Sequence, residues 1–219
     1  MTKIPFKTII LKETPQYLVI NKPAGLIVEK NPYESPTIEE MALQYLQNTK
    51  PNAYLGIVHR LDRVTSGVLL LAKKKSTLKA FNEQFSRRQV RKTYLALVEN
   101  PPSKPQDTLI HWLQKDLKNK KALLSKTPIK NASECRLHYQ LLQKTEKGYL
   151  LEIQPHTGKF HQIRAQLAAI GCPIVGDQKY GASSDFGVNS IALHASKLKF
   201  RDTVSGEWEE IEAQSTFLQ

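Results

Sequence analysis

The sequence has little of what marks secreted, membrane-spanning or zinc-binding proteins. Its two cysteines, Cys135 and Cys172, form no C-x-x-C pair and cannot build a zinc site on their own. The longest clean apolar run, Val68–Ala72, is far shorter than a bilayer span, and residues 1–11 hold no apolar leader segment. We therefore expect buried free thiols, no membrane segment and a cytoplasmic location.

Acidic residues are also in deficit. The chain has 32 Lys and Arg against 20 Asp and Glu, which gives a net charge of +12. Such an excess creates a positive potential that favours polyanions, although charge alone does not separate nucleic acid from an anionic membrane surface. With 219 residues and 40% hydrophobic content, the chain suits one domain with a sizeable core, and 10 Gly and 12 Pro argue against a long disordered segment.

Periodicity predicts more strands than helices. Strands are expected near residues 9–11, 17–21, 56–59, 67–72, 92–98, 137–141, 149–153, 192–200 and 207–211. Helices are expected at 37–47, from about 76, and at 161–170. Thr37 and Glu40 have the spacing of a capping box, and the lysine-rich segment 115–130 is typical of a solvated loop or ribbon. This order, with no regular βαβ alternation, predicts an α+β fold with a mixed, mainly antiparallel sheet flanked by helices and loops.

Familiar cofactor and nucleotide signatures are missing. The sequence contains no P-loop, no G-x-G-x-x-G, no G-x-S-x-G and no H-E-x-x-H. The stretch from His59 to Asp62 reads H-R-L-D, but the order differs from a kinase catalytic loop and no Asn follows at the required place. The six histidines show no zinc-like clustering. We expect neither a bound metal nor a cofactor.

Three segments place polar residues in apolar surroundings: His59–Gly67, Lys92–Tyr94 and Thr157–Arg164. A lone Asp62 in a loop is ordinarily a turn-capping residue. Arg164 stands near the start of a predicted helix, where it either lies on the surface or pairs with a carboxylate or phosphate. The residues by themselves leave these alternatives open.

At these segments the sequence resembles the RluA-like family of pseudouridine synthases. Residues 59–67 read H-R-L-D-R-V-T-S-G and match the family motif H-R-L-D-x-x-T-S-G without a gap. Four further blocks fit in the expected order: N-K-P-A-G-L at 21–26, K-T-Y at 92–94, G-K-F-H-Q-I-R at 158–164 followed by G-D-Q-K-Y-G at 176–181, and L-H-A at 193–195. The resemblance implies the pseudouridine synthase fold and a cofactor-free isomerase that converts uridines in RNA to pseudouridine.

The resemblance also implies roles for single residues. Asp62 is the expected catalytic carboxylate, and it attacks C1′ or C6 or removes a proton from C2′. An ionised carboxylate in a dry pocket needs a cation nearby, so we predict an ion pair between Asp62 and Arg164. Tyr94 is expected to stack on the base and to help remove the C5 proton, whereas its alternation with neighbouring apolar residues is also typical of a buried strand tyrosine.

A further set of residues is expected to bind RNA. Its members are Arg60, Arg63, Lys92, Lys159, His161 and Gln162. A paired uridine must leave its stack to reach the pocket, and Arg60 resembles the motif arginine that fills the vacated space. Lys159 and Phe160 stand where many family members have Arg-Thr, which keeps a positive charge but loses bidentate geometry.

The chain is therefore expected to be a single catalytic domain over residues 1–219, without a separate N-terminal S4-like RNA-binding domain. Its expected partner is ribosomal or transfer RNA, and a monomer is the default because no apolar interface stripe stands out. The alternative is a non-catalytic RNA-binding protein with the same fold.

Overall fold

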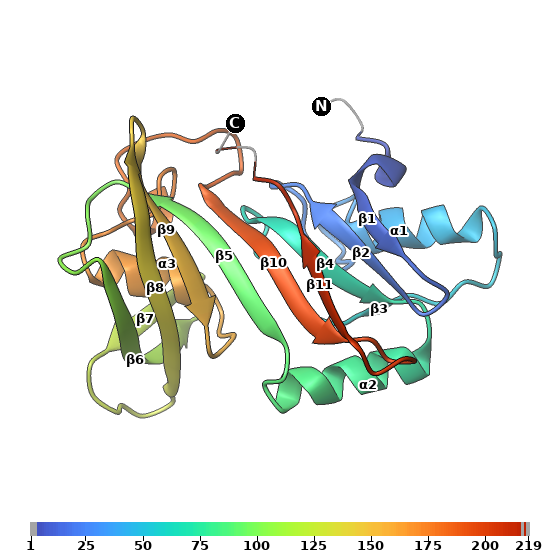
Figure 1. Cartoon of the computed structure of the whole chain (residues 1–219). Coiled ribbons are helices and arrows are strands. Elements are labelled where there is room, and N and C mark those ends of the chain that lie inside the picture. The colour runs from blue at the N-terminus through green and yellow to red at the C-terminus, as the bar shows by residue number, and fades with distance from the viewer. Residues whose placement is uncertain (1–3, 216, 218–219) are drawn as a thin grey trace. The chain divides into compact units, whose positions relative to one another are not determined.

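The structure, a computed structural model, describes residues 4–215 and 217, and the chain forms two compact units (Figure 1). The first unit contains residues 1–91 and 195–219, and the second contains residues 92–194. Each strand is assigned below to the unit that holds most of its residues. The second unit is thus one continuous segment, whereas the first is built from both ends of the chain.

The first unit is a sheet with two α-helices. Its elements are η1 (Phe6–Ile9), β1 (Ile10–Glu13), β2 (Tyr17–Lys22), α1 (Ile38–Gln47), β3 (Gly56–Ile57), β4 (Ser66–Ala72), α2 (Lys75–Ser86), β10 (Leu193–Arg201) and β11 (Trp208–Glu212). The strands lie in the order β1-β2-β4-β10, with β3 beside β4 and β11 beside β10. The pairs β1–β2, β2–β4, β3–β4 and β10–β11 are antiparallel.

The second unit is an antiparallel sheet with one α-helix. Its elements are β5 (Arg91–Val98), β6 (Gln106–Asp116), β7 (Lys121–Ser125), β8 (Ser133–Thr145), β9 (Gly148–Pro155), α3 (Gln162–Ala169) and η2 (Gln178–Tyr180). The strands lie in the order β5-β9-β8-β6-β7. The lysine-rich segment 115–130 therefore contains the β6–β7 turn and strand β7. Of the two alternatives predicted for it, a solvated loop or a ribbon, the structure has the ribbon.

Aromatic rings form the centre of the first unit's core. Tyr17 of β2, Phe81 of α2 and Phe200 of β10 meet edge to face, with ring centroids 5.4 to 5.7 Å apart. All three side chains are fully buried. Edge-to-face packing places the positive ring edge against the negative ring face, which adds to the gain from burial. One cluster thus joins the N-terminal strands, helix α2 and the C-terminal hairpin.

Local sequence signals account for helix α1. The Thr37 hydroxyl accepts from the Glu40 amide, and the Glu40 carboxylate accepts from the Thr37 amide, as the capping-box spacing predicted. The buried stripe is Ile38, Ala42 and Leu46. The apolar spacing in the sequence predicts Ile38, Met41 and Tyr45 on the buried face, but Met41 and Tyr45 are only half buried.

The predicted fold class is confirmed, and the described strand pairs are mainly antiparallel. The sequence pattern missed β6, because residues 106–116 were assigned no strand. The alternating pattern of the two strands expected at 137–141 and 149–153, with Lys144–Gly148 between them, predicts a hairpin, and these strands form the β8–β9 hairpin. Both cysteines are free and buried as predicted. Burial raises the pKa of the Cys135 thiol to about 11, which keeps it protonated. No helix among residues 4–215 and 217 is long and apolar enough to cross a membrane.

Candidate active site

Asp62 lies in the loop between β3 and β4 of the first unit. Its backbone carbonyl accepts from the Thr65 amide at 3.0 Å, which closes a turn around the half-buried carboxylate. The next residue, Arg63, is held to the 23–26 turn: its carbonyl accepts from the Gly25 amide at 2.8 Å, and its Nε donates to the Gly25 carbonyl at 3.2 Å. The loop is therefore fixed by hydrogen bonds at Asp62 and at the residue that follows it.

Lys22 at the end of β2 ties these two segments together. Its side chain is fully buried, and its Nζ donates to the carbonyls of Pro23 and Leu26 at 2.8 Å and to that of Arg63 at 3.3 Å. Burial lowers the pKa of Lys22 to about 7, although the negative charge of Asp62 opposes that shift. The negative charge of Asp62 thus acts on a buried lysine of the same unit.

Arg60 and Arg63 face outward from the same loop. Arg60 Nη1 is 2.6 Å from a Glu29 carboxylate oxygen, and Arg63 Nη1 is 3.0 Å from one of Glu34. Both arginine side chains are exposed, at 66% and 41%. Exposed ion pairs of this kind contribute about 0 to 1 kcal/mol, so an incoming phosphate can replace the glutamates at little cost.

His59 and Gly67 hold the two ends of the loop. Strand β3 is short, and the His59 Nε2 accepts from the Leu70 amide of β4 at 3.1 Å, just beyond the last β3 pairing. The His59 ring also stacks on Phe85 of α2, with centroids 5.1 Å apart. Gly67 has φ of +116°, and a Cβ there would lie 2.2 Å from the Ala195 carbonyl oxygen. Only glycine allows this approach.

In the second unit, Lys92 and Tyr94 lie on β5. Tyr94 is opposite Ile153 of β9 and is half buried. Burial lowers the pKa of Lys92. A Cβ on Gly158 would lie 3.3 Å from the Lys92 Nζ, so the ammonium stands against the turn that precedes α3. The structure therefore brings two of the sequence-predicted segments, 92–94 and 157–164, together.

Gln162 holds the turn before α3 from the inside. Its Oε1 accepts from the Thr157 hydroxyl at 2.8 Å and from the Lys159 amide at 3.0 Å. Its Nε2 donates to the Arg136 carbonyl and to Gln166 Oε1, both at 3.0 Å. Only 4% of the residue is exposed. Each hydrogen-bonding position of this amide is already filled by the protein.

His161 follows the same turn in a left-handed conformation, with φ of +50°. Its ring stacks on Phe160 with centroids 3.8 Å apart, and its Nδ1 lies 3.0 Å from the Tyr180 hydroxyl. That hydroxyl also accepts from the Ala122 amide at 2.7 Å. His161 is thereby connected to strand β7 and to the 176–181 motif.

Arg164 is buried, with 6% of its side chain exposed. Its Nε donates to Asp177 Oδ2 at 2.7 Å and its Nη2 to Asp177 Oδ1 at 2.8 Å, a bidentate pair. The guanidinium also lies 5.1 Å from the centre of the Tyr180 ring. The surface reading of Arg164 is wrong, because this arginine is paired with a carboxylate inside the second unit.

The predicted Asp62–Arg164 ion pair joins residues of different units and stays a prediction. Sequence reasoning gave no role to Lys22, Asp177 or Tyr180, although all three stand in quoted motif blocks. Lys22 follows the apolar residues of β2, whereas Asp177 and Tyr180 stand in the polar stretch 176–181, and neither setting reveals the partner of the residue. Among the described residues there is no group of three or more His, Cys, Asp or Glu able to hold a metal ion.

Comparison with known proteins identifies the family. The overall fold matches the solved structure of human RNA Pseudouridylate Synthase Domain Containing 4, with a TM-score of 0.79, 26% identity, and coverage of 97% of this chain and 90% of that one. Residues 16–169 match the sequence profile described as RNA pseudouridylate synthase. The chain belongs to this family.

Two curated relatives are each named ribosomal large subunit pseudouridine synthase C. The protein from Buchnera aphidicola subsp. Baizongia pistaciae is 35% identical over 208 residues, which cover 90% of this chain and 64% of that protein. The protein from Escherichia coli K12 is 34% identical over 215 residues, which cover 94% and 66%. The chain therefore spans slightly less than two thirds of the length of these relatives.

Proposed function

We propose that this protein is an RNA pseudouridine synthase, with Asp62 as its catalytic carboxylate. The observation that carries the proposal is the 59–67 loop of a chain of the pseudouridylate synthase family, in which the Asp62 carbonyl closes a turn and the negative charge of Asp62 acts on the buried Lys22. Turn capping alone does not require a buried lysine within reach of this carboxylate, which favours a chemical role for Asp62.

The proposed reaction breaks the N1–C1′ bond of uridine, turns the base, and forms a C5–C1′ bond. N1 gains a proton and C5 loses one, so the product is an isomer of the substrate. Asp62 acts as nucleophile or base, and Tyr94 on β5 stacks on the base and assists removal of the C5 proton. The predicted pairing of Asp62 with Arg164 is part of this proposal, because a cation favours the ionised carboxylate.

The proposed RNA contacts come from exposed and half-buried cations. Arg60 and Arg63 extend from the Asp62 loop, Arg60 into the space that the flipped uridine leaves, whereas Lys92 and Lys159 flank the turn before α3. His161 is half buried and available to RNA from the same turn. For Gln162, burial and filled hydrogen bonds favour a role in shaping this turn over the RNA contact that the sequence suggested.

The names of the relatives point to ribosomal RNA of the large subunit as the substrate. We propose that RNA as the first one to test, with transfer RNA as the alternative. The rival function is RNA binding without catalysis on the same fold.

The test is release of tritium from RNA labelled at C5 of uracil. Wild type should release tritium from large-subunit ribosomal RNA that has not been modified, and Asp62→Asn should lower the rate by about 10³-fold or more, because the amide is neither nucleophile nor base. The matched control is Asp107→Asn, an exposed carboxylate paired with Lys104, which should keep full activity. RNA binding by wild type without any release would support the rival function.

A further inference from the structure

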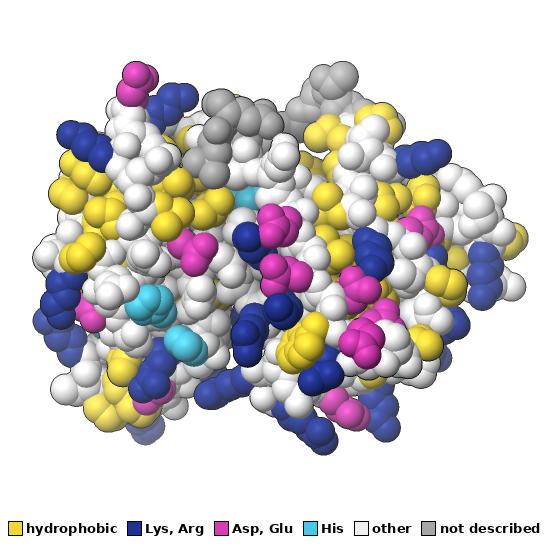
Figure 2. All heavy atoms as spheres, viewed as in Figure 1, with side chains coloured by type: hydrophobic (Ala, Val, Ile, Leu, Met, Phe, Trp, Pro, Cys, Tyr) yellow, Lys and Arg dark blue, Asp and Glu magenta, His cyan; other side chains and the backbone are white. Residues whose placement is uncertain are grey.

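Helix α2 and the residues that flank it form a strongly basic surface. We define the α2 surface as six exposed residues: Lys74, Lys75, Lys79, Arg87, Arg88 and Arg91. Between residues 73 and 91, Glu83 is the only carboxylate in the sequence. Figure 2 shows Lys and Arg side chains along the edge of the molecule where Figure 1 draws α2.

The cations of the α2 surface differ from most others in the first unit because they lack counterions. Carboxylate partners elsewhere in this unit form the pairs Lys12–Glu209, Arg60–Glu29, Arg63–Glu34, Lys73–Glu13, Lys197–Glu212 and Lys199–Glu210. In the described part of the chain, the six side chains of the α2 surface have neither an ion pair nor a hydrogen bond. Their charge is therefore available to an external anion.

The start of α2 also goes against helix electrostatics. Lys74 is the N-cap residue without a side-chain capping bond, and the first turn holds no acidic residue. Lysines at this end face the positive pole of the helix dipole, where acidic residues are stabilising. Helix α1 has the opposite arrangement, with a full capping box and Glu39 in its first turn. A helix start that goes against capping and dipole preferences is expected mainly at functional or strained sites.

The basic residues at the other end have a structural explanation as well. Arg87 and Arg88 follow the last turn of α2, where positive charge is favourable to the helix dipole. The lysines at the start have no such explanation, so they carry the inference. All residues between 73 and 91 are described, and none of their large hydrophobic side chains is exposed. A helix that lies on a membrane presents an apolar side, so RNA is the partner favoured here.

We propose that the α2 surface binds backbone phosphates of the RNA that flanks the target uridine. This inference rests on the proposed function for its substrate, but it concerns binding and not the isomerisation step. With a rise of about 1.5 Å per residue, the 12 residues of α2 extend over roughly 18 Å, enough for several consecutive phosphates. Contacts to phosphates position RNA without reading its sequence.

The experiment compares two double variants that remove the same charge from the first unit. Lys75→Gln with Lys79→Gln changes the α2 surface, whereas Lys7→Gln with Lys50→Gln removes two exposed lysines from separate segments. Binding to purified large-subunit ribosomal RNA is measured by fluorescence anisotropy across a salt series. Wild-type affinity should fall steeply with salt. The α2 double variant should bind about tenfold more weakly at 0.1 M salt, with a log–log slope shallower by about 1.5, because each lost phosphate contact removes about 0.7 to 0.9.

The control double variant should change the slope by less than about 0.5, since general net charge makes no defined phosphate contact. Turnover at saturating RNA should be unchanged in both variants. Equal losses of affinity in the two variants would overturn the proposal, as would lost turnover with intact binding. Selective loss of binding to phosphatidylglycerol vesicles, with RNA binding intact, would assign the surface to a membrane and also overturn it.

The binding assay separates this inference from the proposed function. Weaker RNA binding in the α2 double variant alone supports RNA binding by the α2 surface, even if wild type releases no tritium. In that case only the proposed isomerase activity is rejected. An active wild type whose two double variants bind RNA alike keeps the proposed function and rejects the surface.

Discussion

Lys22 shows how far burial changes the chemistry of one residue. Its ammonium is removed from water and bonded to the carbonyls of Pro23, Leu26 and Arg63. Carbonyls compensate only part of the lost hydration, so the pKa falls to about 7. The folded state releases the Lys22 proton near pH 7, whereas the unfolded chain keeps it up to the usual lysine pKa of 10.5. Between these two pH values the unfolded state therefore binds more protons than the folded state. Raising the pH through this window therefore favours the folded state.

We predict that the stability difference between wild type and Lys22→Met increases with pH. From pH 7 to pH 9 the wild type should gain about 2 kcal/mol relative to the variant, which has no proton to lose at this position. Urea unfolding at both pH values measures the difference. Lys50→Met, a change at an exposed lysine, should show no such trend. A constant difference for Lys22→Met would mean that Lys22 stays charged in the folded protein.

At the scale of elements, the start of β4 requires a glycine. Gly67 combines a left-handed φ of +116° with backbone atoms of Ala195 at 2.2 to 2.7 Å from where a Cβ would stand. The Ala195 atoms belong to the main chain of β10 and cannot move aside as a flexible side chain would. The end of the Asp62 loop is therefore determined by close packing of two strands and not by the turn sequence alone.

We predict that Gly67→Ala destabilises the protein by about 3 kcal/mol or more, since backbone strain and a main-chain clash act together. Gly206→Ala is the matched control, because φ there is +74° and no atom lies within 4 Å of the added Cβ. Gly206→Ala should lower the free energy of unfolding by only about 1 to 2 kcal/mol, because only the left-handed conformation is strained there. Thermal or urea unfolding of both variants distinguishes the two effects, and equal losses would remove the packing argument.

Helix α3 is the element whose buried side chains are least expected from its sequence. It buries Gln162, Arg164 and Gln166 among its apolar residues. Gln166 donates to the Leu109 carbonyl at 3.1 Å, and Arg164 pairs with Asp177. Buried polar groups persist only when they are paired, so this helix is oriented by specific bonds and less by an apolar stripe.

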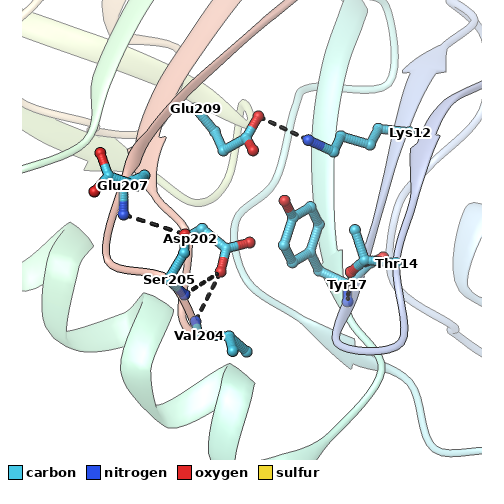
Figure 3. A network of polar contacts seen from close by, with 8 residues as sticks. All are labelled: Lys12, Thr14, Tyr17, Asp202, Val204, Ser205, Glu207 and Glu209. Atoms are coloured by element: carbon cyan, nitrogen blue, oxygen red, sulfur yellow. Dashed lines mark hydrogen bonds and ion pairs between the residues drawn. The ribbon is translucent and has the colours of Figure 1, made fainter.

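At the scale of the whole molecule, the two ends of the chain meet in the first unit. Lys12 Nζ lies 2.8 Å from a Glu209 carboxylate oxygen. Figure 3 shows this pair and the Tyr17 ring, which is directed toward the β10–β11 turn. Burial and the neighbouring Asp202 carboxylate raise the pKa of Tyr17. Burial opposes ionisation of Asp202, but the amides of Ser205 and Val204 and the Tyr17 hydroxyl outweigh it and lower the pKa of Asp202.

We predict that Asp202→Asn costs about 1 kcal/mol or more at pH 7, because it weakens the turn bonds that the carboxylate accepts. Since the folded-state pKa of Asp202 lies below its usual 3.8, this stability is present above that value and is lost as the pH falls through the folded pKa. In urea titrations the difference from wild type should thus stay constant from pH 7 down to about pH 4 and shrink below that. Glu209→Gln, which removes a partly exposed ion pair, should cost less than about 1 kcal/mol at pH 7.

Much of the fold follows from local patterns that need no partner. The period of two predicted the β8–β9 hairpin, and the Thr37–Glu40 spacing predicted where α1 begins. Such signals depend on residues close in the chain, so the sequence carries them directly. The α1 stripe was displaced by one residue because packing against neighbouring elements decides which of two adjacent apolar rows is buried.

For the candidate site, the sequence by itself determined the chemistry-bearing types and their motif, with Asp62, Tyr94 and Arg164 as the expected catalytic set. Only the tertiary structure decided that Lys22 is buried with Asp62 acting on its charge, that Asp177 holds Arg164, and that Gln162 faces inward. The reason is physical: the partner of a buried charge or amide is chosen by proximity in space, and residues 22 and 63, or 164 and 177, become neighbours only after the chain has folded.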